Sequence, residues 1–119
     1  MTYRVLIVED DPFIALDLET TMEDAGFEVL GPVASAVEAM RILNTCREDP
    51  DCALIDFYIT GGTSESIARE LSERDVPLIV VTGNRDDAMK SLEDFTDLVR
   101  CKPVAPARIV RDVRNAVSA

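Results

Sequence analysis

Five short apolar segments recur along this 119-residue chain, and each leads into a stretch with the composition or spacing of a helix. The predicted strands are residues 3–8, 28–33, 53–55, 77–82 and 97–101. Uninterrupted apolar runs such as 53–55 and 77–82 are typical of parallel strands that are buried on both faces. Strands that alternate with helices favour a parallel sheet with helices on both faces, most simply in the flavodoxin-like order 2-1-3-4-5. The predicted fold class is therefore α/β with five parallel strands.

The ends of the predicted helices are marked by residues that favour caps. Gly26 suits the position just after the first helix, because glycine readily adopts a left-handed backbone conformation there. The stretch 86–93 predicts a short, weak helix with few apolar side chains. The predicted helix starts are Asp11 followed by Pro12, Ser35, either Thr63 or Ser64, and Pro106.

The overall charge and length exclude several classes of function. Twelve Lys and Arg residues stand against 23 Asp and Glu, which gives a net charge of −11. A chain this acidic repels nucleic acids and anionic membranes, so we expect neither as a direct partner. No segment is apolar for long enough to span a membrane, and the amino terminus lacks a signal peptide, so we expect a cytoplasmic location. The chain has no histidine, so it supplies no imidazole base and cannot carry phosphohistidine itself.

The three cysteines, Cys46, Cys52 and Cys101, are odd in number and have no CxxC spacing. We therefore expect neither a disulfide framework nor a zinc site. Cysteine without such a partner behaves as a small apolar residue, so all three are predicted to lie in or near the core.

Polar residues follow four of the predicted strands. Glu9 and Asp10 follow the first, Asp56 the third, Thr82 ends the fourth, and Lys102 follows the fifth. In the order 2-1-3-4-5 the first and third strands are neighbours, so three carboxylates would meet at one edge. Two unit charges about 4 Å apart repel by roughly 4 kcal/mol at an effective dielectric constant of about 20. Such a cluster needs a cation or a shared proton, and oxygen ligands with room for phosphate favour Mg²⁺.

The same residues predict a chemistry. A carboxylate held beside a metal ion can attack a phosphoryl donor and form an acyl phosphate, a known form of covalent catalysis. Such a transfer depends on positioning and charge neutralisation. Lys102 can offer a point charge to one phosphoryl oxygen, and the Thr82 hydroxyl can donate a hydrogen bond to another. Asp56, at the end of a buried strand, is the predicted nucleophile.

Four segments together resemble the receiver domain of two-component response regulators, and the resemblance covers the whole chain. It implies that Asp56 is the phosphoacceptor and that Asp10 binds Mg²⁺ directly, while Glu9 acts mostly through water. It also implies that the main-chain carbonyl of Tyr58 is the third protein ligand, and that Thr82 and Lys102 are the switch hydroxyl and the phosphate-binding lysine. The four segments are Val8-Glu9-Asp10-Asp11, the strand that ends at Asp56, Val81-Thr82-Gly83, and Cys101-Lys102-Pro103 with an expected cis peptide bond before its proline.

The resemblance further implies how such a chain works. The phosphoryl donor would be a phosphohistidine of a sensor histidine kinase or a phosphotransfer protein. Residues 1–119 would form one stand-alone receiver domain without an output domain, which acts by docking an unidentified downstream protein or by relaying phosphate. It would catalyse its own phosphorylation and slow dephosphorylation but act mainly as a signalling switch. Its output face would comprise the fourth strand, the fourth helix, the fifth strand and the fifth helix, with homodimer formation left open.

The sequence also departs from the usual pattern of these domains. Thr60, Gly61 and Gly62 occupy a loop that usually holds proline and then glycine, and Val99 replaces the usual aromatic switch residue. Tyr58 is bulkier than the common residue there. It either controls the access of water to the acyl phosphate or is simply a partly exposed ring.

Other readings of the same residues remain to be compared with the first. A receiver-shaped module that is never phosphorylated would dock its partner constitutively. A flavin carrier would need a phosphate-binding loop after the first strand, where Glu9 and Asp10 stand instead. An aspartate-based phosphatase would usually need a second acid at the place of Tyr58.

Overall fold

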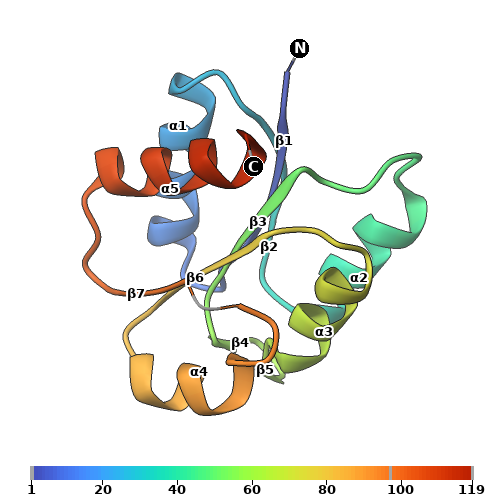
Figure 1. The fold of residues 1–119 in the computed structure, drawn as a ribbon, viewed down its shortest axis with the longest axis vertical. Helices are drawn as coiled ribbons and strands as arrows, with labels where there is room; N and C mark the ends of the chain where they lie inside the picture. The colour runs from blue at the N-terminus through green and yellow to red at the C-terminus, as the bar shows by residue number, and fades with distance from the viewer. Residues whose placement is uncertain (1, 97, 119) are drawn as a thin grey trace.

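The computed structural model describes residues 2–96 and 98–118 and contains one parallel sheet between two layers of helices (Figure 1). The strand order is β2-β1-β3-β6-β7, and every pairing in this sheet is parallel. The predicted order is therefore confirmed, with β6 and β7 as the fourth and fifth predicted strands. The predicted start of the last strand, Asp97, lies outside the described residues. The strands are β1 (Arg4–Val8), β2 (Glu28–Val33), β3 (Cys52–Ile55), β6 (Leu78–Thr82) and β7 (Val99–Cys101).

Helices cover both faces of the sheet. In Figure 1, α1 and α5 lie on one side, while α2 and α3 lie on the other, with α4 at the lower end. Buried side chains of α1 and α5 share one hydrophobic cluster, and those of α2, α3 and α4 share the other. The helices are α1 (Pro12–Asp24), α2 (Ala36–Thr45), α3 (Glu65–Glu73), α4 (Arg85–Leu92) and α5 (Pro106–Ser118).

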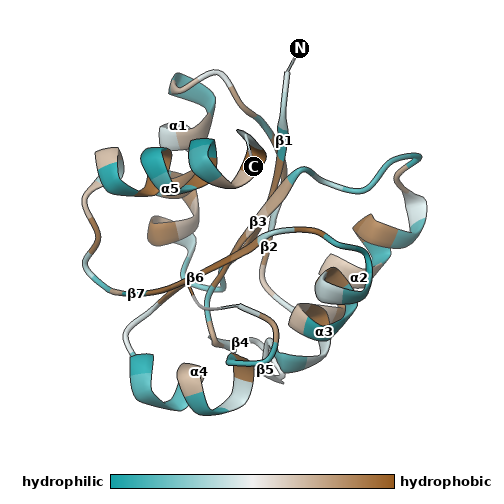
Figure 2. Ribbon diagram, viewed as in Figure 1, coloured by the Kyte–Doolittle hydropathy of each residue, from teal (hydrophilic) through white to brown (hydrophobic). Residues whose placement is uncertain are grey.

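Successive residues of the central strands enter opposite clusters. In β1, Val5 and Ile7 pack on the α1/α5 side, and Leu6 and Val8 pack on the other side. All four are fully buried, as expected for a parallel strand covered on both faces. Figure 2 shows the same arrangement as hydrophobic strands surrounded by helices with hydrophilic outer faces.

The helix ends follow the predicted caps. The Asp11 carboxylate accepts hydrogen bonds from the Phe13 and Ile14 amides at 2.9 and 3.2 Å, and Pro12 opens α1. Gly26 follows the cap with a φ of +93°, a conformation that favours glycine. The helix predicted at 86–93 begins and ends one residue earlier, and Lys102–Pro103 is cis, as the resemblance implied.

A short hairpin that the sequence analysis had described only as a loop follows β3. It consists of β4 (Tyr58–Ile59) and β5 (Gly62–Thr63), which pair antiparallel. Two residues connect the strands, and the second, Gly61, has a φ of +91°. Glycine at such a turn is a known hairpin signal, but two-residue strands are too short to show a periodic pattern. Ile59 is buried in the core and anchors the hairpin next to the end of β3.

The cysteines are free, as predicted, but their burial differs. Cys52 in β3 is fully buried and Cys46 is partly buried, whereas Cys101 is exposed. The prediction that all three lie in or near the core is therefore wrong for Cys101, because it ends an edge strand. No helix within 2–96 or 98–118 combines the length and apolar character needed to cross a membrane.

Candidate functional site

Two neighbouring strands bring the three predicted carboxylates together. β1 and β3 pair in register up to Val8 and Ile55, so both strands end at the same edge of the sheet. The Asp56 amide continues this pairing with a hydrogen bond to the Val8 carbonyl at 3.0 Å. One carboxylate oxygen from each of Glu9, Asp10 and Asp56 lies within 4.8 Å of the others. The predicted cluster is therefore present.

The three carboxylates differ in burial. Glu9 is only 4% exposed, Asp56 is partly buried, and Asp10 is exposed. Burial raises the pKa of Glu9, and hydrogen bonds from Lys102 and the Asp11 amide oppose that effect only in part. The ionised Glu9 side chain therefore depends on nearby positive charge.

Lys102 supplies that charge. Its Nζ donates hydrogen bonds to Glu9 Oε1 at 2.6 Å and to Asp56 Oδ2 at 2.7 Å. Burial by itself lowers the pKa of Lys102, but the hydrogen bonds to Asp56 and Glu9 outweigh it, so the pKa is raised and the side chain stays charged. Three carboxylates and one ammonium group leave two uncompensated negative charges, which one divalent cation can neutralise.

Both oxygens of Asp56 already have hydrogen-bond partners. Oδ1 accepts from the Phe57 amide at 2.6 Å, and Oδ2 accepts from Lys102. Each oxygen keeps a further lone pair, so a metal ion or a phosphoryl group can bond to this carboxylate beside the two donors. From the sequence, Lys102 was expected to bind a phosphoryl oxygen; its bridge between Glu9 and Asp56 was not predicted.

Thr82 ends β6 and is fully buried. Its strand lies directly beside β3, so the residue stands at the predicted edge. Its Oγ1 accepts a hydrogen bond from the Asn84 amide at 3.2 Å. The backbone carbonyl of Thr82 accepts from the Lys102 amide at 2.9 Å, which fixes the two residues relative to each other.

Tyr58 points towards α4. The residue is 45% exposed, and its ring packs edge-on against Phe57, with the ring centres 4.8 Å apart. Its hydroxyl donates to Asp87 Oδ2 at 2.7 Å, and this hydrogen bond raises the pKa of Tyr58. Asp87 is not among the residues predicted from the sequence, because a pairing across 29 residues leaves no local pattern. Val99, in the place of an aromatic residue, is buried in the core.

These features together define a class: a flavodoxin-like α/β domain with an acidic pocket, a bridging lysine and a threonine at the carboxyl edge of its sheet. The model of the response regulator receiver domain family matches residues 5–114, so the chain belongs to that family. Receiver domains bind Mg²⁺ at such an acidic site and interact with histidine kinases or phosphotransfer proteins in two-component signalling. The predicted family is therefore confirmed, as is the predicted Mg²⁺ cofactor at the level of the family.

Three similar proteins illustrate the family. The DNA-binding response regulator MtrA of Mycolicibacterium smegmatis is 32% identical over 119 residues, covering 96% of this chain and 50% of MtrA. The phyllosphere-induced regulator PhyR of Methylorubrum extorquens is 28% identical over 119 residues, covering 98% of this chain and 44% of PhyR. The receiver domain of sensor histidine kinase PA1611 from Pseudomonas aeruginosa PAO1, crystallised with magnesium in its active-site cleft, has a TM-score of 0.86 at 23% identity, with 100% of both chains covered.

The chain spans about half the length of the curated relatives it matches. What those whole proteins do therefore does not transfer directly to this chain. Because MtrA is a DNA-binding regulator, the expectation that this chain has no nucleic-acid partner stays a prediction. The likeness to the PA1611 domain, at 23% identity, supports the fold.

Proposed function

We propose that this receiver accepts a phosphoryl group on Asp56 in a magnesium-dependent reaction. The observation that supports this most is the cluster of Glu9, Asp10 and Asp56, with ligand atoms within 4.8 Å and Lys102 bonded to two of them. Asp10, Asp56 and the main-chain carbonyl of Tyr58 would hold the Mg²⁺ ion, with Glu9 acting mostly through water. When bound, the ion neutralises negative charge on the phosphoryl oxygens.

The transfer itself is a displacement at phosphorus. A carboxylate oxygen of Asp56 forms a bond to the phosphorus of a phosphohistidine, the P–N bond breaks, and the electron pair leaves with the imidazole of the donor. The product is an acyl phosphate on Asp56, which water later hydrolyses to restore the carboxylate. No oxidant or reductant is needed.

Two further side chains have roles in this step. Lys102 already bonds Asp56 Oδ2 and can move to a phosphoryl oxygen as charge builds up there. The Asn84 amide uses one lone pair of the Thr82 hydroxyl, so the hydroxyl can still donate its own hydrogen to a second phosphoryl oxygen. Thr82 and Lys102 share a backbone hydrogen bond and therefore act from a common rigid support.

The donor is a sensor histidine kinase or a phosphotransfer protein, and the chain acts as a stand-alone cytoplasmic receiver that relays phosphate or docks another protein. Its output face is formed by β6, α4, β7 and α5. The absence of histidine agrees with a donor on another protein. The chain catalyses its own phosphorylation and dephosphorylation, and these reactions turn the signal on and off.

The test is phosphorylation by a small phosphodonor. The protein is incubated with acetyl phosphate and Mg²⁺, and its intact mass is measured. We expect the mass of one phosphoryl group on the wild type, its loss when Mg²⁺ is chelated, and none on Asp56→Asn. Asp86→Asn, an exposed acid on α4, serves as the control and should behave as wild type. Absence of added mass on the wild type, or equal labelling of Asp56→Asn, would contradict the proposal.

A second function, constitutive docking without phosphorylation, has one observation in its favour. Val99 is buried where receivers usually have an aromatic switch residue, so one familiar route for transmitting the signal is missing. The two functions differ in their response to beryllofluoride, a phosphate mimic. A partner whose binding is unchanged by beryllofluoride and Mg²⁺ would support constitutive docking.

A further inference from the structure

Two side-chain hydrogen bonds join the first turn of α4 to the site. Tyr58 Oη donates to Asp87 Oδ2 at 2.7 Å, and the Asn84 amide donates to Thr82 Oγ1 at 3.2 Å. Within the parts of the chain that the structure describes, residues 84–88 make no other side-chain hydrogen bond, and Asn84 does not cap the helix with its own side chain. The side-chain hydrogen bonds of this turn are therefore made with two residues of the site, Tyr58 and Thr82.

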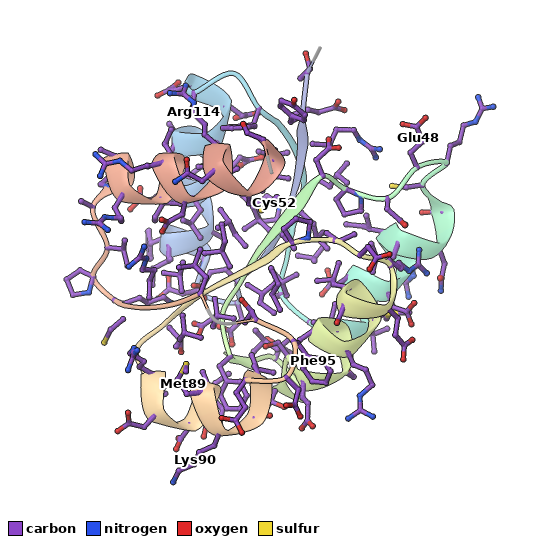
Figure 3. All side chains as sticks on the ribbon, viewed as in Figure 1. Glu48, Cys52, Met89, Lys90, Phe95 and Arg114 are labelled. Carbon is purple, nitrogen blue, oxygen red and sulfur yellow. The ribbon has the colours of Figure 1, made fainter. Side chains whose placement is uncertain are left out.

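The rest of α4 is held differently. Ala88 and Leu92 are fully buried in the core, while Lys90 projects away from the molecule (Figure 3). Apolar contacts, including those of Ala88, thus fix one side of the helix, whereas residues 84–87 are exposed and make the two polar contacts. Segments with few buried contacts are the first to open locally, so the first turn is the part of α4 that can respond to the site.

Asp56 connects to the same tyrosine through the backbone. Its Oδ1 accepts the Phe57 amide hydrogen at 2.6 Å, and the buried Phe57 ring packs edge-on against the ring of Tyr58. A phosphoryl group on Oδ1 would weaken the hydrogen bond from the Phe57 amide, because a phosphorylated oxygen is a poorer acceptor, and one on Oδ2 would draw Lys102 towards the phosphoryl oxygens. The acyl phosphate carries about 1.5 to 2 negative charges where the carboxylate carried one, so the site gains roughly 0.5 to 1 negative charge, which disfavours the carboxylate of Asp87.

We propose that Asp87, acting through the hydroxyl of Tyr58, is a positioning residue that couples the state of Asp56 to the position of α4. The hydrogen bond holds the first turn of α4 against β4 in the unphosphorylated protein, and phosphorylation weakens it. Val99 carries no aromatic ring that could move between two positions. The hydrogen bond between Tyr58 and Asp87 therefore provides a different route from the site to the helix. The inference rests on the proposed function for its input, the phosphorylation of Asp56.

Hydrogen exchange of the α4 amides tests the coupling in wild type, Tyr58→Phe, Asp87→Ala and the double variant. Each is measured alone and with Mg²⁺ and beryllofluoride, with Asp86→Ala as the matched control on the same exposed turn. We expect beryllofluoride to speed exchange of the Ala88 and Met89 amides severalfold in the wild type. Both single variants should already exchange that fast without the mimic and respond little to it. The double variant should match the single variants, because one hydrogen bond is removed in all three.

The outcomes separate the coupling from the proposed function. Unchanged α4 exchange in Tyr58→Phe, or an equal effect of Asp86→Ala and Asp87→Ala, would overturn the coupling. If beryllofluoride leaves the exchange of the wild-type protein unchanged, that result contradicts the phosphorylation of Asp56. The comparison of the variants without the mimic would still decide whether Tyr58 and Asp87 hold α4. Tyr58→Phe keeps the ring and alters an exposed hydroxyl, so the variant should fold normally.

Discussion

Two basic residues stand two positions apart, Arg100 in β7 and Lys102 directly after it, and their ion pairs are built in opposite ways. Arg100 forms a fork with Asp112 of α5, in which Nε and Nη2 each bond one carboxylate oxygen at 2.9 Å. Lys102 instead divides its ammonium group between Glu9 and Asp56, two carboxylates that follow the ends of β1 and β3. Asp112 is 6% exposed and Glu9 is 4% exposed, so burial does not distinguish the two groups.

The difference lies in charge and geometry. The Arg100–Asp112 pair is neutral and satisfies both partners, so it fastens α5 to the sheet and has nothing further to bind. The cluster of Lys102 with the three carboxylates keeps two uncompensated negative charges. The ammonium group of Lys102 can also move from one oxygen to another. We call Arg100–Asp112 the closed pair, because it stabilises the fold and leaves no charge unpaired. The Lys102 cluster is open, because its remaining negative charge can bind a cation and take part in chemistry.

The largest expected effect comes from removing the bridging lysine. Lys102→Ala should slow phosphorylation by acetyl phosphate by about a hundredfold, the order of magnitude lost with one donor to a developing negative charge. Magnesium affinity should stay the same or increase, because a competing cation is gone. Time-resolved intact mass and a magnesium titration measure the two effects. Lys90→Ala, an exposed lysine on α4, is the control, and a Lys102→Ala variant that reacts at the wild-type rate would contradict the account.

The opposite result is expected at the closed pair. Asp112→Ala leaves the Arg100 guanidinium half-buried without a partner, which should lower the free energy of unfolding by about 2 kcal/mol, reduced from the usual loss because Arg100 is partly exposed. The initial rate of phosphorylation under folded conditions should stay within about twofold of wild type. Urea unfolding and the mass assay measure the two effects, and Asp86→Ala is the exposed control. If Asp112→Ala lost most of its phosphorylation rate but none of its stability, the distinction between the closed pair and the Lys102 cluster would be contradicted.

A smaller effect is expected from a buried group that has no partner charge. Burial raises the pKa of Cys52 from 9.0 to about 12, so the folded state keeps the thiol neutral while the unfolded state ionises near pH 9. The stabilisation is complete below pH 9 and is lost as the pH rises towards 12, by about 1.4 kcal/mol at pH 10.

Urea unfolding at pH 8 and pH 10 measures this loss. Cys52→Ala should remove that part of the alkaline decrease, whereas Cys101→Ala, which changes an exposed thiol, should retain it. An identical pH dependence in wild type and Cys52→Ala would show that burial of this thiol does not contribute.

The features that could be predicted from the sequence are those with a local or periodic signal. Uninterrupted apolar runs and residues such as Asp11 and Gly26 indicated the strands and the ends of α1. Because the carboxyl ends of parallel strands share one edge, the strand order then placed Glu9, Asp10 and Asp56 together. The sheet order and the acidic cluster follow from these two kinds of information.

The features that could not be predicted depend on long-range side-chain geometry. The β4–β5 hairpin has strands of two residues, too short for a pattern. No sequence pattern indicates that Lys102 donates hydrogen bonds to both Glu9 and Asp56. The hydrogen bond from Tyr58 to Asp87 likewise has no sequence signal. The exposure of Cys101 follows from its place at the end of an edge strand, which composition alone does not reveal.

The most direct test of the account asks which residue carries the phosphoryl group. Protein treated with acetyl phosphate and Mg²⁺ is reduced with borohydride, which converts an aspartyl phosphate to homoserine, and the peptides are sequenced by mass spectrometry. The account predicts homoserine at position 56 in a magnesium-dependent yield, with Asp10 unchanged. Homoserine at another aspartate, or none at position 56 in protein that has gained a phosphoryl group, would contradict it.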